Sequence, residues 1–546
     1  METAIVNVFK AMGQIGLLLV KSVVWLITRL PASLGSGSRT KAAPSKTTES
    51  ERLAGCRDVV MQFARIYGHI ARECMTREEL EAKIDSGIQP EELSAELFRR
   101  IDATPGIVLG VNTINPTIEI KLPSSLRDRH CYIIGKSGSG KTNLIRNMLF
   151  QDLEFGSGIG IIAPEQELLT EEIMPYIPET RIDDVVYFNP SDTVSPIPFN
   201  PLYLADGEDI DLKVDDNLTI FKRLMGETQA RMDEILRQTL YALMARPDST
   251  LLDVEKLLDR ADDEFRKEVI AMSDDEQTRY FFEKTYTSFP KDAHLPITTR
   301  INRLVRPRMV RTLLCQPGRC FNFQEAMDDG KILLFNLADG LIGEQTAELL
   351  GQLIVSKIQL AAMSRMDIPK AARRPFYLYM DEFQTFTGVN ETSYEKMLSR
   401  ARKYELCLTL AHQQTGQIPK LLMREILGNV STLIAFTVSH VDATMLTQEY
   451  PVDMGAKIEY VPVEEFVSLK VGEAWGKIGK SVFPLKTALA PQKPDFTRTK
   501  TVIERSRENY GIKSQRGNKV QSNVQKPVQK AVATDASFPF DSDTVF

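Results

Sequence analysis

The feature that most restricts the possible folds of this chain is a glycine-rich stretch near residue 138. It consists of Gly135, Lys136, Ser137, Gly138, Ser139, Gly140, Lys141 and Thr142. An apolar run at 132–134 comes directly before it and predicts a buried strand, and the pattern over 142–153 predicts an amphipathic helix. The spacing matches the phosphate-binding loop, G-x-x-x-x-G-K-[ST], in the strand–loop–helix context that this motif requires. The chain is therefore expected to bind a nucleoside triphosphate.

The residue types in this loop are those that phosphate binding requires. Gly135, Gly138 and Gly140 allow the backbone to curl so that successive N–H groups point at phosphate oxygens. The N-terminus of the following helix adds a partial positive charge. Lys141 would then reach the β- and γ-phosphates, and the hydroxyl of Thr142 would bind Mg²⁺. A glycine-rich turn with a chance lysine is the alternative, and the flanking strand and helix disfavour it.

Length and composition indicate a cytoplasmic protein of several domains. The chain has 546 residues and a formal net charge of −6, and such a length is enough for about three domains or more. Because the net charge is negative, any contact with nucleic acid must come from local basic patches. The six cysteines are scattered, as in a protein whose thiols stay reduced.

Apolar runs alternate with helical patterns on both sides of a long helical stretch. The runs lie at 159–163, 185–188, 332–337, 376–380, 406–410 and 432–437. Strands that alternate with helices predict an α/β fold with a mainly parallel, twisted sheet. Between 206 and 320 the strand pattern stops, and this segment is predicted to be an all-α insertion.

The predicted boundaries follow these changes of pattern. They are an apolar N-terminal helix at 1–30, a linker at 31–50, a helical region at 51–104, the first part of the core at 105–205, the insertion at 206–320, the second part of the core at 321–500 and a disordered tail at 501–546. Strands at 107–110 and 118–122 are expected to form a small sheet that leads into the strand before the phosphate-binding loop. A β-hairpin after 474 is expected to end the folded part.

The first thirty residues allow four interpretations. Residues 12–28 are just long enough to span a bilayer, but Lys21 lies near the middle, where a charge costs roughly 2.5–3.5 kcal/mol. On a helix the polar residues form one narrow stripe, which suits an interfacial helix or a spanning helix that faces partner helices. A helix docked on the protein itself and a cleaved signal peptide are the other two. We adopt membrane association at the inner face of the cell membrane as the prediction.

A second group of polar residues completes the predicted site. The apolar run 376–380 ends in Asp381 and Glu382. In a phosphate-loop enzyme the first acid holds Mg²⁺ with the loop threonine, and the second orients and polarises a water. Water as the acceptor predicts ATP hydrolysis. Gln413 follows the run 406–410, and an amide at that strand tip can contact the γ-phosphate or the attacking water.

Two groups of arginines are candidates for contacts with other molecules. Arg400 and Arg402 lie between two predicted strands, and either could stabilise charge in the site of a neighbouring subunit. A second group lies in 299–320, which has no acidic residue: Arg300, Arg303, Arg306, Arg308, Arg311 and Arg319. This segment is expected either to contact a phosphate backbone or to pair with the acidic insertion upstream.

Together these motifs resemble the HerA–FtsK superfamily of ring-forming, DNA-pumping ATPases. The likeness rests on the phosphate loop and on the segments 381–384 (DEFQ), 401–404 (ARKY), 410–413 (LAHQ) and 428–436 (GNVSTLIAF). It is strongest to the conjugative coupling proteins of type IV secretion, with their TraD/TraG-like DNA-binding domain, and it covers residues 106–497. Relatives often carry Asp-Pro-His-Gly-Asp after the second strand. This chain has APEQE at 163–167, which lacks the first aspartate.

The resemblance implies a RecA-like core, ATP and Mg²⁺ as cofactors, a hexamer around DNA, and partners among secretion-system components. An N-terminal membrane anchor is frequent in coupling proteins. The residues that match the functional positions of the family are Lys141, Thr142, Asp381, Glu382, Gln413 and, for the arginine supplied in trans, Arg402.

The leading prediction is an ATPase that translocates DNA in type IV secretion or conjugative transfer. One alternative keeps the ATPase but has it drive protein export or pilus assembly, which suits the net negative charge. Another is a scaffold that uses nucleotide only to assemble, and the acid pair argues against it. A GTPase is disfavoured because the chain has no Asn-Lys-x-Asp motif. A small-molecule kinase is disfavoured because the second acid would have no role.

Overall fold

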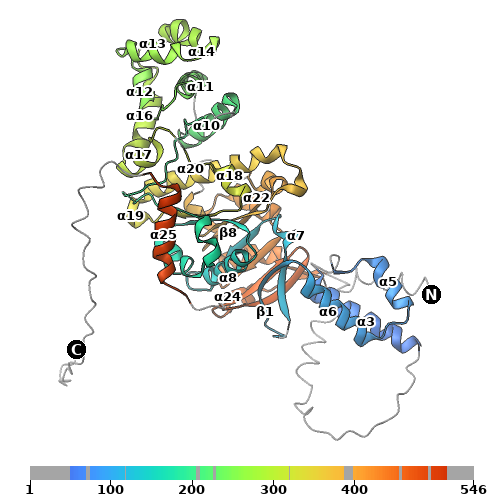
Figure 1. Cartoon of the computed structure of the whole chain (residues 1–546). Coiled ribbons are helices and arrows are strands. Elements are labelled where there is room, and N and C mark those ends of the chain that lie inside the picture. Colours follow the sequence, from blue (N-terminus) through green and yellow to red (C-terminus); the bar gives the residue numbers. More distant parts are fainter. Residues whose placement is uncertain are drawn as a thin grey trace, which may run out of the picture.

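The computed structural model describes residues 49–68, 74–116, 118–192, 194–204, 209–225, 229–318, 320–386, 397–453, 458–489 and 494–512. They form an α/β core, a helical lobe that projects from it, and a smaller group of helices on another side (Figure 1). The apolar segment 12–28, predicted as a membrane anchor, lies outside the described residues, as does the chain beyond 512. Within the described ranges, no helix is both long and apolar enough to cross a membrane.

The core is built on one sheet of 11 strands in the order β2-β1-β13-β12-β9-β3-β8-β7-β4-β6-β5. The strands from β9 to β5 are parallel to one another. They are β9 (Thr432–Ala435), β3 (Cys131–Ile134), β8 (Leu406–His412), β7 (Phe376–Met380), β4 (Gly158–Ala163), β6 (Ile332–Asn336) and β5 (Val185–Phe188). Each is a mostly apolar run that is buried over its whole length, as expected of parallel strands covered on both faces. The predicted α/β fold class is confirmed.

Helices cover both faces of this sheet. Tyr132 and Ile134 of β3 pack into the core on one face, and Ile133 packs into the core on the other, because successive side chains of a strand point to opposite faces. Helix α8 (Lys141–Glu154) covers the Ile133 face and α20 (Glu344–Met363) covers the opposite face. Because α8 follows β3 directly, its N-terminus lies at the edge where the parallel strands end, and ligands bind at this edge in such folds.

Four antiparallel strands extend the sheet beyond β9. They are β12 (Glu473–Ile478), β13 (Ser481–Thr487), β1 (Gly106–Asn112) and β2 (Glu119–Pro123). β12 pairs with β9, and β1 pairs with β13 through Gly110 and Thr487. The prediction of a small sheet at 107–110 and 118–122 is therefore wrong in extent. The hairpin β12–β13 pairs with β9 through β12, which would leave β13 as a free edge. β1 pairs with β13 instead, so both hairpins become part of the main sheet.

The folded part does not end at this hairpin. Helix α25 (Thr497–Tyr510) follows it and lies along β5 at the far edge of the sheet (Figure 1). Its Val502 is fully buried, and its Ser506 Oγ accepts a hydrogen bond of 2.7 Å from the backbone N–H of Tyr187. The predicted disorder from 501 onward is therefore wrong for 501–510. Tertiary packing over the edge strand, rather than the polar sequence itself, makes this segment helical.

The helical lobe comes from the segment predicted as an all-α insertion. Its longer helices are α10 (Ile210–Met225), α11 (Ala230–Ala245), α12 (Asp253–Leu258), α13 (Asp263–Ala271), α16 (Leu295–Val305) and α17 (Arg308–Leu314). Pro307 is the N-cap residue of α17 and separates it from α16, as expected for a residue that cannot continue a helix. Figure 1 shows α13 at the far end of the lobe and α17 near the core. Helices α16 and α17 carry most of the arginines of the segment 299–320, so this segment includes the part of the lobe that lies next to the core.

The N-terminal helical region packs at the side of the core where β1 lies (Figure 1). It contains α3 (Glu49–Tyr67), α5 (Arg77–Asp85) and α6 (Pro90–Ala103). Helix α6 begins with Pro90 at its first position and has Gln89 as its N-cap. Proline is favoured there because a backbone N–H in the first turn of a helix has no partner within the helix, so the lack of one costs nothing.

Candidate nucleotide-binding site

The ends of three adjacent strands bring the predicted site residues to one edge of the sheet. β8 lies between β3 and β7, with Ile134 opposite His412 and Met380 opposite Leu410. The phosphate-binding loop follows β3, Gln413 follows β8, and Asp381 follows β7. Because parallel strands end at the same edge, the amide of Gln413 lies between the loop and the acid pair.

The loop has the backbone shape that its glycines allow. Gly138 and Gly140 have φ values of 71° and 116°, a region that side chains other than glycine rarely occupy. Lys141 Nζ donates hydrogen bonds to the carbonyl oxygens of Gly135, at 2.8 Å, and Lys136, at 3.3 Å. Burial lowers the pKa of Lys141, while the charges of Glu382 and Asp381 act to raise it. The lysine is thus held across the loop, with its charge close to where phosphate oxygens would lie.

Thr142 and Asp381 face each other at the start of α8. Thr142 Oγ1 donates a 3.4 Å hydrogen bond to Asp381 Oδ2. Burial, together with the neighbouring charge of Glu382, raises the pKa of Asp381 to about 6, and Lys141 opposes this shift. A half-buried carboxylate beside a hydroxyl is a set of oxygen ligands that fits Mg²⁺, which prefers one or two carboxylates together with phosphate oxygens. These two residues therefore fit the metal that the phosphate-loop motif implies.

Glu382 is held by two side-chain amides. Gln413 Nε2 donates to Glu382 Oε1 at 2.6 Å, and Gln384 Nε2 donates to Glu382 Oε2 at 2.7 Å. The backbone of Glu382 has a φ of 48°, which is uncommon outside glycine and is found where a local structure imposes it. Gln384 lies in the segment 381–384 that resembles the family motif, but no pattern in the sequence indicated a role for it. The structure connects it to the predicted base.

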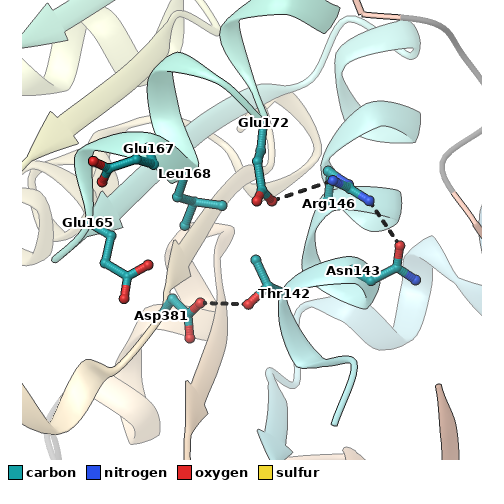
Figure 2. A pocket seen from close by; sticks show the side chains of 8 residues that line it. All are labelled: Thr142, Asn143, Arg146, Glu165, Glu167, Leu168, Glu172 and Asp381. Atoms are coloured by element: carbon teal, nitrogen blue, oxygen red, sulfur yellow. Dashed lines mark hydrogen bonds and ion pairs between the residues drawn. The ribbon is translucent and has the colours of Figure 1, made fainter. Parts of the chain in front are cut away.

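A cavity of about 310 Å³ opens beside Thr142 and Asp381 (Figure 2). It is lined by Thr142, Asn143, Arg146, Glu165, Glu167, Leu168, Glu172 and Asp381. Arg146 donates to Asn143 Oδ1 at 3.1 Å and to Glu172 Oε2 at 3.4 Å. Sequence reasoning missed Asn143, Arg146 and Glu172. The spacing could have indicated Arg146, because Thr142 and Arg146 are four residues apart on α8 and share a helix face.

The departure from the family pattern at 163–167 is visible in this cavity. Ala163 supplies no carboxylate, but Glu165 does, and its side chain points towards Asp381 in Figure 2. The charge of Glu165 also contributes to the raised pKa of Asp381. The site therefore has an acidic side chain from the end of β4, two positions after the one where relatives often carry aspartate.

The two candidate trans arginines lie away from the site of their own subunit. Arg402 belongs to the short helix η7 (Ala401–Tyr404), which precedes β8, so it lies at the opposite edge of the sheet from Gln413. Its Nε donates to Asp128 Oδ2 at 2.9 Å. Arg400 is exposed at the start of the same helix. The structure thus brings five predicted residues together, Lys141, Thr142, Asp381, Glu382 and Gln413, and leaves the arginines apart.

Comparison with known proteins finds one matching family and several similar folds. Residues 375–448 match the family described as "TraM recognition site of TraD and TraG". The plasmid coupling protein TrwB in complex with ADP and Mg²⁺ is 14% identical, with a TM-score of 0.50 over 72% of this chain and 94% of that one. The trigonal form of the conjugative coupling protein TrwB with sulphate, also 14% identical, gives a TM-score of 0.50 over 73% and 93%. VirB4 of Thermoanaerobacter pseudethanolicus is 17% identical, with a TM-score of 0.47 over 71% and 97%. No curated protein matches in sequence.

The fold and the phosphate-binding loop define a RecA-like P-loop fold. It is similar to the fold of the coupling protein TrwB, and the segment 375–448 matches the TraD/TraG family. The predicted resemblance to conjugative coupling proteins is confirmed. The matched segment contains Asp381, Glu382, Arg402 and Gln413.

Proposed function

We propose that this protein binds ATP with Mg²⁺, hydrolyses it, and uses the energy to translocate DNA in type IV secretion or conjugative transfer. The observation that carries the proposal is the meeting of a phosphate-binding loop, an acid pair and an amide at the ends of β3, β7 and β8. Coupling to DNA is supported by the coupling-protein fold and by the exposed arginines of the segment 299–320.

The residues have distinct roles in this reaction. The loop N–H groups and Lys141 bind and orient the β- and γ-phosphates. Thr142 and Asp381 would hold Mg²⁺, which would compensate the negative charge of those phosphates. Glu382 orients and polarises the attacking water, and the carboxylate accepts its proton. Gln413 donates to Glu382 and follows β8, the strand next to β3, so it can position the water relative to the γ-phosphate.

The arginines of the lobe support DNA as the cargo. Five of them are described and exposed: Arg300, Arg303, Arg306, Arg308 and Arg311. Among the residues that the structure describes, none pairs with any of the five in a salt bridge. The expected alternative, pairing with the acidic insertion, therefore has no support from this part of the chain. Exposed cations without ion-pair partners are suited to contact a phosphate backbone.

Assembly and location belong to the same proposal. A motor of this type is expected to act as a hexamer around DNA, with Arg402 or Arg400 completing the site of a neighbouring subunit. Partners are secretion-system components and, in view of the family description of 375–448, a protein of the relaxosome. The expected location is the cytoplasm, at the inner face of the membrane where the apolar segment 12–28 would attach it.

The test is ATPase activity with and without DNA. Wild-type protein is expected to hydrolyse ATP faster with DNA. Lys141→Ala is expected to lower turnover by about 100- to 1000-fold, because it removes a hydrogen-bond donor that stabilises the charge developing in the transition state. A Glu382→Gln variant should lose turnover but keep nucleotide binding. Equal rates with and without DNA would contradict the DNA motor and favour the alternative cargo, a protein or pilus subunit. No turnover at all would leave only the nucleotide-dependent scaffold.

A matched pair of triple variants locates the DNA contact. Changing Arg303, Arg306 and Arg308 to Gln should weaken DNA binding and reduce the slope of log affinity against log salt by about 3, one per lost phosphate contact. The control changes Lys256, Lys267 and Lys284 of the same lobe to Gln, which alters the net charge equally. Lys256 and Lys267 already pair with Asp253 and Asp263. If both triple variants reduce the slope equally, the arginine segment is not the DNA contact.

A further inference from the structure

A buried carboxylate outside the catalytic residues ties the end of β8 to a neighbouring helix. Asp442 lies in α23 (His440–Leu446) and is 4% exposed. Its Oδ1 accepts hydrogen bonds from the backbone N–H of Thr415, at 3.0 Å, and from Thr415 Oγ1, at 2.6 Å. Its Oδ2 accepts a bond of 2.5 Å from Ser439 Oγ. Burying a carboxylate costs free energy unless such bonds compensate it, so the contact with Thr415 is a defined feature of the fold.

Capping of α23 does not explain this arrangement. Ser439 is the N-cap residue and accepts a hydrogen bond of 3.2 Å from the N–H of Asp442, which is the usual capping contact. That contact uses the serine hydroxyl and the aspartate backbone. The two bonds from Thr415 use the aspartate side chain and satisfy no group of α23. They connect the helix to the segment that follows Gln413.

Gln413 therefore lies between two anchors. On one side, His412 is fully buried with its Nε2 bonded to the hydroxyl of Tyr132, and its carbonyl oxygen accepts a 3.3 Å bond from the N–H of Gly135. On the other side, Thr415 is held by Asp442. The first anchor fixes β8 to the strand that carries the phosphate loop. The second fixes the turn after Gln413, whose amide reaches Glu382.

The chain that follows α23 returns to the phosphate loop. Leu469 accepts a 2.7 Å hydrogen bond from Thr437 Oγ1, and the N–H of Gly472 donates to the carbonyl of Ser139 at 2.9 Å. In between, α23 packs against α24 (Val463–Val467). The described parts of 439–472 are thus fixed to the Gln413 turn at one end and to the phosphate loop at the other.

We propose that Asp442 is a positioning residue for ATP hydrolysis, which acts through Thr415 to hold the Gln413 amide against Glu382. This inference rests on the proposed function.

Kinetics separate this role from a merely structural one. Asp442→Ala and Thr415→Val are each expected to lower kcat about tenfold or more, since small displacements of catalytic groups have such effects, with KM and nucleotide affinity unchanged. The double variant should be no slower than the single ones, because both remove the same connection. Asp442→Asn keeps an acceptor oxygen and should recover most of kcat. Thr444→Val is the matched control, since Thr444 is an exposed residue of α23 whose hydroxyl donates to the carbonyl of His440 in the same helix.

Two outcomes overturn the inference: unchanged kcat in Asp442→Ala, or a loss of kcat that Thr444→Val shares. Amide hydrogen exchange gives a readout that does not depend on turnover. Peptides covering 406–417 should exchange faster in Asp442→Ala than in wild type or Thr444→Val. An inactive wild type with this exchange difference would contradict the proposed function alone, whereas an active wild type without it would contradict the positioning role alone.

Discussion

The two ends of helix α8 contact strand β7 and the residue directly after it, and each contact contains an aspartate. At one place, Asp152 of α8 lies against Tyr379 of β7. Asp152 is fully buried and accepts bonds from both terminal nitrogens of Arg127 and from the Tyr379 hydroxyl. At the other place, Asp381, directly after β7, has a 3.4 Å bond from Thr142 and a 3.0 Å bond from the N–H of Glu382.

The difference separates a structural carboxylate from one that is prepared for a ligand. Asp152 is neutralised by the guanidinium of Arg127, which also stacks over the ring of Tyr377 at 3.6 Å. Asp381 has a second acid next to it and a pKa raised by burial to about 6. Its charge is compensated by weak partners within the chain, so a bound cation would relieve an unfavourable state. The same helix and strand thus provide both rigidity and a site.

The largest expected effect on stability is at Asp152. Asp152→Ala should lower the free energy of unfolding by about 3–5 kcal/mol, because Arg127 would keep a buried charge without its partner. Urea denaturation followed by circular dichroism measures this change. The control is Asp263→Ala, which removes an exposed aspartate paired with Lys267 and should leave the denaturation midpoint nearly unchanged. Similar midpoints for the two variants would contradict the structural role of Asp152.

The opposite sign is expected at Asp381. Asp381→Asn should raise the stability of nucleotide-free protein by about 1–3 kcal/mol, since it removes a charge whose pKa lies about two units above its ordinary value. The same variant should lose the tightening of nucleotide binding by Mg²⁺. Thermal denaturation and binding of a fluorescent ATP analogue, with Mg²⁺ or with a chelator, check the two parts. A destabilised variant would show that Asp381 is structural like Asp152.

The pH dependence of that difference has a defined direction. The folded-state pKa of Asp381, about 6, lies above the unfolded value of roughly 3.9, so folded protein binds the extra proton between these values. The contribution of Asp381 to stability therefore falls as pH rises from about 4 to about 6 and stays low above that. The gap in melting temperature between Asp381→Asn and wild type should widen from pH 5 to pH 7. A constant gap would contradict the raised pKa.

The sequence predicted most of the contact at Asp381 and none of the contact at Asp152. Thr142 and Asp381 belong to motifs whose spacing encodes their chemistry, so each could be placed at a strand end before the structure was known. Arg127 and Asp152 lie in no motif. Their pairing depends on how far α8 runs back over the sheet, which no local pattern specifies.

The two errors in the fold have a related cause. The helix at 497–510 and the pairing of β1 with β13 both depend on partners more than a hundred residues away. Local propensity favoured a polar, disordered tail for the first and a separate small sheet for the second. In both cases burial of a strand edge decided the structure. The contacts of Gln384 and Asp442 were missed for a different reason, because their bonds to Glu382 and Thr415 are recognised only from side-chain geometry.

The smallest expected effect on stability is at Arg402, which pairs with Asp128. This pair extends the comparison to a charge on an exposed side chain. The Arg402 side chain is 46% exposed, and such pairs contribute about 0–1 kcal/mol. Arg402→Ala should therefore leave the melting temperature nearly unchanged. If Arg402 instead acts on the site of a neighbouring subunit, turnover should still fall by about a thousandfold or more.

Mixed assemblies decide where that charge acts. Arg402→Ala subunits retain Lys141, and Lys141→Ala subunits retain Arg402, so neither variant alone should turn over ATP. Mixing them should restore part of the activity, because some intact sites would then lie beside an intact arginine. Arg400→Ala, tested in the same mixtures, distinguishes the two candidates. Failure of both arginine variants to complement would place their effect within a single subunit, where Arg402 lies at the opposite edge of the sheet from the phosphate loop and could influence the site only through β8.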